Sequence, residues 1–134
     1  VDISPGALED INKLPLDKRG KEFNIFALTD ALGARNKKEA WVLYQKALLA
    51  GVSAEEIFFK LFWQVKSMLI VSKVKTVSET EMKPFTYNKA KSFLKNFKPD
   101  ELERLSEDLV TGYLLARRGE GEMETLIEKI LLKL

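Results

Sequence analysis

The sequence predicts an all-α protein, a bundle of about five main helices joined by short loops. Apolar residues recur every three or four positions along most of the chain, and no segment alternates apolar and polar residues for long enough to predict a strand. Residues that favour helix starts and glycines that favour helix ends separate these periodic segments. With 134 residues, 46% apolar and 31% charged, the chain has the size and composition of one soluble globular domain.

The first part of the chain, residues 1–22, is predicted to be a linker and the remnant of a preceding domain. Proline and glycine recur there, and the stretch offers a poorer core than the residues that follow. One short amphipathic helix is expected within it, with apolar residues at helical spacing at Ala7, Leu8, Ile11 and Leu14. The helical domain is therefore expected over residues 23–134, and the chain is expected to be a fragment of a larger protein.

Glycines and capping residues predict the first two helices of the domain. A brief helix from Asn24 should stop at Gly33, because glycine tolerates the left-handed conformation that ends helices. The next helix should start at Asn36, since Asn followed three residues later by Glu39 is close to a capping box. This second helix is expected to run to Gly51.

The longest predicted helix starts at Ser53 and continues to about Val74. At about 100° per residue, its broad apolar arc comprises Ile57, Phe58, Leu61, Phe62, Val65, Met68 and Leu69. A narrow polar stripe comprises Lys60, Gln64 and Ser67, and a second apolar strip bordered by lysines comprises Phe59, Trp63 and Ile70. Because it has two apolar sides, this helix is predicted to pack on two sides.

Three further elements complete the predicted bundle. Residues 75–83 are polar without a strong period and are expected to form a loop. Thr86 is predicted to cap the next helix, and Pro99 occupies the favoured first position of the helix after it, which should end before Gly119. A final helix is expected over about residues 121–134.

The residue inventory argues against an enzyme. The chain has no Cys and no His, so thiol nucleophiles, imidazole bases and the commonest transition-metal ligands are absent. There is also no phosphate-binding loop of the GxxxxGK[ST] type. The closest acidic pairs are Glu55 with Glu56, which suit a helix's first turn, and Glu79 with Glu81, which lie in the polar loop. We therefore expect no catalytic, cofactor or metal site.

Local charge offers one nucleic-acid hypothesis. The net charge of +2 is too small to argue for DNA binding. Residues 73–98, however, include seven lysines and two glutamates, which gives a local net charge of +5. Tyr87, Phe93 and Phe97 lie among the lysines in the sequence. Those aromatics have the spacing of core residues, so a solvated lysine face is favoured over DNA contact. A helical DNA-binding module stays an alternative function.

The candidate interaction site is the second strip of the long helix, Phe59, Trp63, Lys66 and Ile70. If the helix is surrounded within its own bundle, this strip is core. If it is exposed, an aromatic strip flanked by basic residues is typical of a protein–protein contact. Trp41 and Tyr44 leave the same two interpretations open. An unrelated helical adaptor that binds a peptide in the groove beside Trp63 is a further alternative.

Two properties bear on location. No apolar run is long enough to span a membrane, and no signal peptide pattern is present at the start of the sequence. We therefore expect a cytoplasmic protein without membrane contact.

Five segments follow one another in an order that matches a known family pattern. Residues 24–33 read N-I-F-A-L-T-D-A-L-G, residues 48–51 read L-L-A-G, and residues 64–69 read Q-V-K-S-M-L. Residues 83–89 read K-P-F-T-Y-N-K, and residues 105–119 place Tyr113 and Arg117 before Gly119. Together they resemble the C-terminal helical domain of bacterial DNA polymerase III delta subunits, part of the sliding-clamp loader. Lys66 stands where that family has Arg, Lys83 where it has His, Tyr113 where it has Asp and Arg117 where it has Lys.

The resemblance covers about residues 23–134 and implies a role in assembly. It implies a collar domain that packs with equivalent domains of the tau/gamma and delta-prime subunits. Contact with the sliding clamp would belong to an N-terminal domain that this chain lacks, and DNA contact is not expected from the collar domain alone. The strip Phe59, Trp63, Lys66 and Ile70 is then the expected subunit interface.

Overall fold

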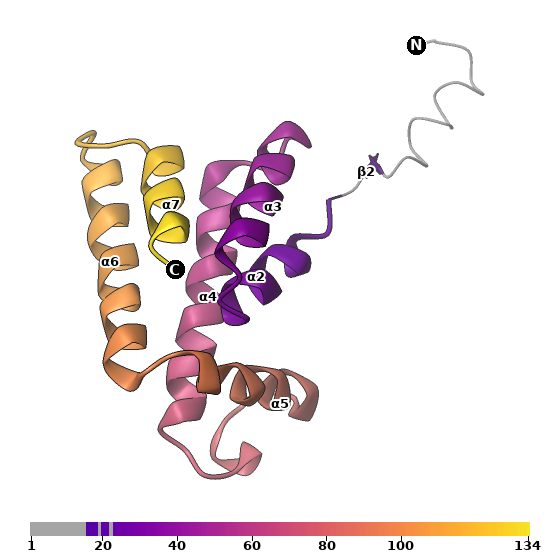
Figure 1. Ribbon diagram of the computed structural model, residues 1–134, viewed down its shortest axis with the longest axis vertical. Helices are drawn as coiled ribbons and strands as arrows, with labels where there is room; N and C mark the ends of the chain where they lie inside the picture. The colour runs from indigo at the N-terminus through magenta and orange to yellow at the C-terminus, as the bar shows by residue number, and fades with distance from the viewer. Residues whose placement is uncertain (1–15, 19, 22) are drawn as a thin grey trace.

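The computed structural model describes residues 16–18, 20–21 and 23–134 (Figure 1). This part of the chain contains six α-helices: α2 (Ile25–Gly33), α3 (Lys37–Leu49), α4 (Ala54–Ser72), α5 (Pro84–Phe93), α6 (Pro99–Arg117) and α7 (Met123–Leu132). Two single turns of 3-10 helix, η1 (Val77–Glu79) and η2 (Leu94–Asn96), lie in the connections before and after α5. The predicted all-α class is confirmed.

A short antiparallel pair of strands, β1 (Leu16–Lys18) and β2 (Gly20–Lys21), precedes the helices. The sequence pattern predicts a linker here and no strand. Strands of three and two residues are too short to show a period of two in the sequence. The amphipathic helix predicted at Ala7–Leu14 lies outside the described residues. The pair does not change the fold class.

Side-chain caps fix three helix starts. The Oδ1 of Asn36 accepts a hydrogen bond from the Glu39 N–H, and the Oγ of Ser53 accepts one from the Glu56 N–H, each at 3.1 Å. Asn24 caps α2 in the same way. The Glu39 carboxylate accepts from the side-chain amide of Asn36 rather than from its backbone, so the capping box is incomplete. The predicted starts at Asn36 and Ser53 are confirmed.

The predicted cap of α5 is wrong. The helix begins at Pro84, with Lys83 as the residue before it, so Thr86 lies inside the first turn. Proline suits that first position because the missing N–H has no partner there in any helix. Pro99 begins α6 as predicted, and Gly51 and Gly119 follow α3 and α6 with φ of +91° and +77°.

Helix α4 is the centre of the bundle. It contacts each of the five other α-helices described, with α6 on one side, α2 and α3 on the other, and α5 crossing its lower end in Figure 1. Its buried side chains are those of Ile57, Phe58, Leu61, Val65, Met68 and Val71. Most of its broad apolar arc is therefore core, whereas the second apolar strip, expected to give the helix a second packing side, is not among the buried residues.

Candidate protein interface on helix α4

The strip predicted as an interface faces solvent. Phe59, Trp63, Lys66 and Ile70 follow one another at intervals of four, three and four residues, so they form one line along α4. The exposed fractions are 42% for Phe59, 55% for Trp63 and 36% for Ile70, and Lys66 is also exposed. The interpretation of this strip as core is therefore wrong for the described chain. Whether a partner covers it stays a prediction.

The aromatic side chains of the strip are held in place by their neighbours. The Lys66 ammonium lies 4.7 Å from the centre of the Trp63 ring, a cation–π distance. The Phe59 ring packs edge-on against Phe58, at 5.3 Å between centroids, and at a tilt against Tyr113 of α6, at 5.5 Å. Because Phe58 is buried and also stacks on Tyr113, at 5.1 Å, the Phe59 ring rests on packed aromatic neighbours.

The exposed apolar surface continues onto α6. Val110 is 43% exposed and Leu114 is 52% exposed, and they stand one turn apart beside Tyr113. The apolar period of α6 did not predict them as part of an interface, although both lie off the face that carries the buried Leu102 and Leu109. The candidate interface, defined as the α4 strip with Val110 and Leu114, therefore spans two helices.

A pocket opens on the other side of Trp63. It has a volume of about 280 Å³ and lies between α2, α4 and α5. Phe26 and Phe85 line it and are 62% and 74% exposed. The predicted polar stripe of α4, Lys60, Gln64 and Ser67, forms its third wall. Phe26 and Phe85 carry the same kind of signal as Val110 and Leu114, since neither is among the buried residues of its own short helix.

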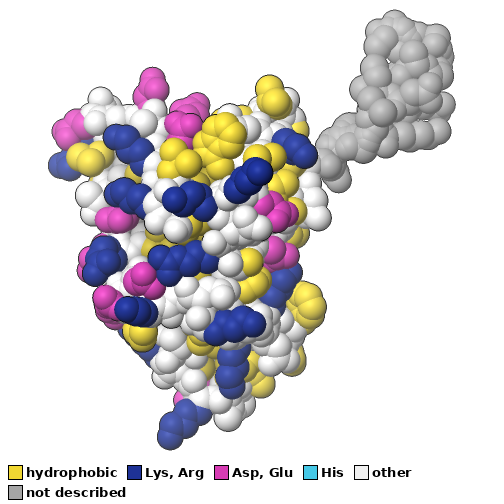
Figure 2. Space-filling view, in the orientation of Figure 1, with side chains coloured by type: hydrophobic (Ala, Val, Ile, Leu, Met, Phe, Trp, Pro, Cys, Tyr) yellow, Lys and Arg dark blue, Asp and Glu magenta, His cyan; other side chains and the backbone are white. Residues whose placement is uncertain are grey.

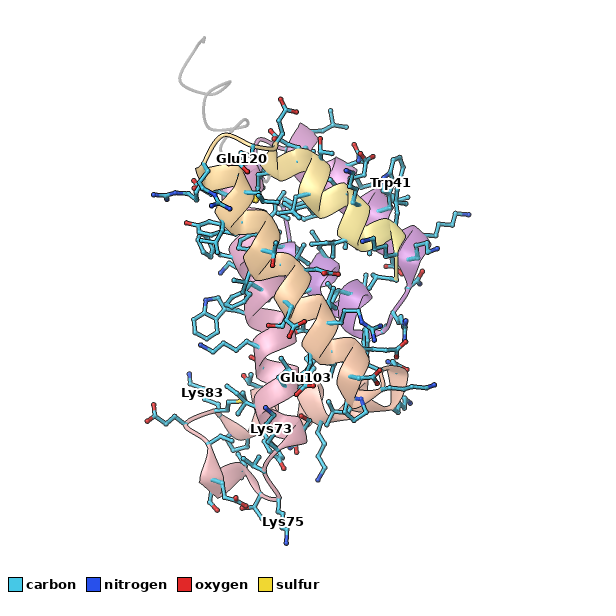
Figure 3. The ribbon with its side chains drawn as sticks, turned by 90° about the vertical axis from the view of Figure 1, so that its left-hand side faces the viewer. Trp41, Lys73, Lys75, Lys83, Glu103 and Glu120 are labelled. Carbon is cyan, nitrogen blue, oxygen red and sulfur yellow. The ribbon has the colours of Figure 1, made fainter. Side chains whose placement is uncertain are left out.

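The lysine-rich segment divides into core and surface as expected. Tyr87 and Phe97 are buried, which confirms that these two aromatics belong to the core. In Figure 3 Lys73, Lys75 and Lys83 gather around the end of α4 and the loop that follows it, at the opposite end of the molecule from Trp41 and Glu120. Figure 2 shows Lys and Arg side chains spread among acidic and apolar ones on another face, rather than in one patch.

Three of the four residues in the acidic pairs, Glu55, Glu56 and Glu79, lie at a helix start or bind backbone N–H groups. Glu55 and Glu56 lie in the first turn of α4, where carboxylates suit the helix dipole. One carboxylate oxygen of Glu79 accepts hydrogen bonds from the N–H groups of Lys75 and Thr76, each at 3.1 Å. In the described part of the chain, no group of three or more acidic residues is arranged to hold a metal ion. No helix there is long and apolar enough to cross a membrane.

Trp41 and Tyr44, for which two interpretations were open, join α3 to α7. The Trp41 Nε1 donates a hydrogen bond to the Glu128 carboxylate at 3.2 Å. The Tyr44 hydroxyl donates to the backbone carbonyl of Glu124 at 2.9 Å, and burial raises the pKa of Tyr44 to about 12, with the charges of Glu124 and Glu128 adding to the rise. Tyr44 is 1% exposed, so it is a core residue.

Comparison with known families decides the relationship. Residues 22–134 match the family described as the DNA polymerase III delta subunit, C-terminal domain. This chain belongs to that family. No curated protein and no solved structure gives a significant match. The match confirms the resemblance seen in the sequence, and it contradicts the alternative of an unrelated helical adaptor.

The segments that resemble the delta family can now be placed in this delta C-terminal domain. Residues 24–33 form α2 and its cap, and residues 64–69 lie within α4 and include Lys66 of the exposed strip. At the positions where the family pattern has Asp and Lys, this delta domain pairs Tyr113 with Arg117. The Arg117 Nη1 donates to the Tyr113 hydroxyl at 3.3 Å, and its guanidinium carbon lies 5.8 Å from the ring centre. In this chain the two residues, one turn apart on α6, therefore contact each other through a hydrogen bond and a cation–π pair.

Proposed function

We propose that this domain is a non-catalytic oligomerisation domain, a collar domain, of a DNA polymerase III delta subunit. It helps to assemble the clamp loader that places the sliding clamp on DNA during replication. The single observation that carries the proposal is the candidate interface, an aromatic strip left exposed on α4, which contacts each of the five other α-helices described. Exposed apolar surface of this kind marks contact sites in soluble proteins.

The chemistry of the strip suits a protein partner. Trp, Tyr and Phe are enriched at the centres of interfaces, where they bury large areas with few rotatable bonds. Phe59 and Trp63 are already positioned by Phe58, Tyr113 and Lys66, so little side-chain freedom remains to be lost on binding. The strip is therefore suited to packing against a helix of a neighbouring subunit.

The expected partners are the tau/gamma and delta-prime subunits, through their own collar domains. Residues 1–22 would connect this domain to the preceding one, and contact with the sliding clamp would belong to an N-terminal domain. The site of action is the cytoplasm. Direct DNA contact is not expected from this domain alone, and the dispersed lysines of Figure 2 agree with that expectation.

Size-exclusion chromatography tests the proposal. The chain is mixed at micromolar concentration with the tau/gamma and delta-prime collar domains of the same organism, and co-elution is expected. Trp63→Ser and Phe59→Ser should abolish or strongly reduce it, because each removes a large ring from the centre of the strip. Leu49→Ser is the matched control, since Leu49 is 88% exposed at the end of α3, outside the strip. Failure of the unaltered chain to co-elute would overturn the proposal.

A further inference from the structure

At the pocket between α2, α4 and α5, each of three exposed aromatic rings has a lysine ammonium beside it. The rings are Phe26, Trp63 and Phe85, and we call this hollow the aromatic pocket. The ammonium of Lys60 lies 5.9 Å from the Phe26 ring centre, that of Lys66 4.7 Å from Trp63, and that of Lys89 5.5 Å from Phe85. Each ring that rims the pocket therefore carries a positive charge beside it.

Positive side chains outnumber negative ones in the lining of the pocket. Among the described residues that line it, Asp30 is the one acidic side chain, and the Lys89 ammonium pairs with its carboxylate at 2.9 Å. Lys60 has no carboxylate within 4 Å in the described part of the chain, and neither has Lys66 on the adjoining turn of α4. Lys60 therefore borders the pocket without a carboxylate partner in the described chain, and Lys66 lies nearby, beside the Trp63 ring, so both ammoniums can attract negative charge.

The pocket is large enough for a side chain. Its volume is about 280 Å³, whereas an apolar cavity of about 150 Å³ is enough to hold a benzene ring. A phenylalanine or leucine side chain can therefore enter between Phe26, Trp63 and Phe85. An anchor of this size in an aromatic-lined hollow is a common source of binding energy between proteins.

We propose that the aromatic pocket binds an acidic segment of a partner protein, with one large apolar side chain of that segment inserted as the anchor. The carboxylates of the segment meet Lys60 and Lys66, and the anchor displaces water from the three rings. The inference rests on the proposed function, because Trp63 belongs both to the α4 strip and to the pocket. It adds a second element of recognition, formed by α2 and α5, to the packing of α4.

A single-stranded nucleic acid is less well matched to this pocket. Bases stack on open aromatic faces, but here lysine ammoniums already lie within cation–π distance of all three rings. An acidic peptide places its negative charge at the rim and only its apolar side chain inside.

Fluorescence titration of the full chain tests the inference. Trp41→Phe leaves Trp63 as the single tryptophan, so its emission reports occupation of the pocket. The main probe is a short glutamate-rich peptide with one central phenylalanine. Its comparison probes replace that phenylalanine by alanine, or the glutamates by lysines, and oligo-dT serves as the nucleic-acid probe. The main probe is expected to bind, and added salt is expected to weaken it.

Variants separate this inference from the proposed function. Phe26→Ser and Phe85→Ser should each weaken the main probe by about tenfold or more, whereas Phe59→Ser, which alters the strip but not the pocket, should leave it unchanged. Circular dichroism checks that each variant keeps its helices. If the unaltered chain binds the main probe but does not co-elute with the tau/gamma and delta-prime collar domains, the collar function is contradicted and this inference is not. The inference is overturned if the main probe does not bind at millimolar concentration, if the alanine or lysine peptide binds equally well, or if oligo-dT binds more tightly.

Discussion

The guanidinium of Arg35 forms two hydrogen bonds with the carboxylate of Glu101, at 2.9 and 3.1 Å. Arg35 lies in the turn between α2 and α3 with φ of +58°, a region that non-glycine residues rarely occupy, and Glu101 lies in the first turn of α6. The same guanidinium donates to the carbonyl of Asn96 at 3.0 Å and lies 4.9 Å from the Phe97 ring centre. These contacts compensate the unusual backbone and tie two distant turns together.

Acid is expected to weaken this tie. The hydrogen bond from Arg35, and next the one from the Lys98 N–H, lower the pKa of Glu101 from 4.5 to about 2. Because the folded pKa lies below the unfolded one, the stabilisation is complete at neutral pH and is lost as the pH falls from about 4.5 to about 2. Urea unfolding of the chain and of Glu101→Gln should differ at pH 7 and converge near pH 2. A difference that stays constant across this range would contradict the assignment.

Tyr44 is expected to stabilise the contact between α3 and α7 through its hydroxyl. Tyr44→Phe should lower the free energy of unfolding by about 1 kcal/mol, the usual net contribution of a buried hydrogen bond. Chemical denaturation measures this change. Tyr113→Phe is the control, because the Tyr113 hydroxyl lies at the surface and pairs only with Arg117 in the described chain, so its loss should have little effect. Equal stability of Tyr44→Phe and the unaltered chain would contradict the role of the bond to Glu124.

Local chemistry accounts for what the sequence predicted well. Asn36, Ser53 and Pro99 act within one helical turn, so their positions could be read without knowing the fold. Pro84 and Thr86, two residues apart, are both residue types that favour a helix start, and α5 begins at Pro84. The exact first residue of such a helix depends on a small difference in free energy between alternative starts one or two residues apart.

Exposure could not be predicted in the same way. The period of α4 places Phe59, Trp63 and Ile70 on one line, but whether another helix covers that line depends on how all the helices pack. The aromatic pocket depends on three separate elements meeting, so Phe26 and Phe85 had no reason to be associated in the sequence. Their positions off the buried faces of α2 and α5 were the available signal.

Gln64 is expected to cost stability. Its Nε2 is buried and has no hydrogen-bond partner among the described residues. Gln64→Met replaces the amide by an apolar group of similar length and should raise the free energy of unfolding by about 1 kcal/mol. Gln45→Met on α3 is a matched control without a buried unpaired amide and should give no such gain. Destabilisation by Gln64→Met, measured by thermal unfolding, would indicate that the amide has a partner such as an ordered water.

Gly112 is expected to be required for the close approach of α6 and α7. A Cβ atom at this position would lie 2.1 Å from the Leu126 Cδ1. Gly112→Ala should therefore lower the free energy of unfolding by about 1–3 kcal/mol through overpacking, although alanine favours a helix by about 1 kcal/mol over glycine. In a Leu126→Ala background the clash is removed, so the same Gly112→Ala change should become stabilising. A double-mutant cycle by urea unfolding measures this reversal, and additive effects would contradict it.

The two-helix extent of the candidate interface gives the last prediction. If a partner subunit packs across α4 and α6 together, Val110→Ser and Leu114→Ser should weaken co-elution with the tau/gamma and delta-prime collar domains. Because both side chains are about half exposed, the free energy of unfolding should change by less than about 0.5 kcal/mol. Leu132→Ser on α7 is the control, since Leu132 is 48% exposed and lies outside the interface as defined. Reduced assembly for the α4 variants with normal assembly for both α6 variants would restrict the contact to α4, where Phe59 and Trp63 would then form its whole aromatic centre.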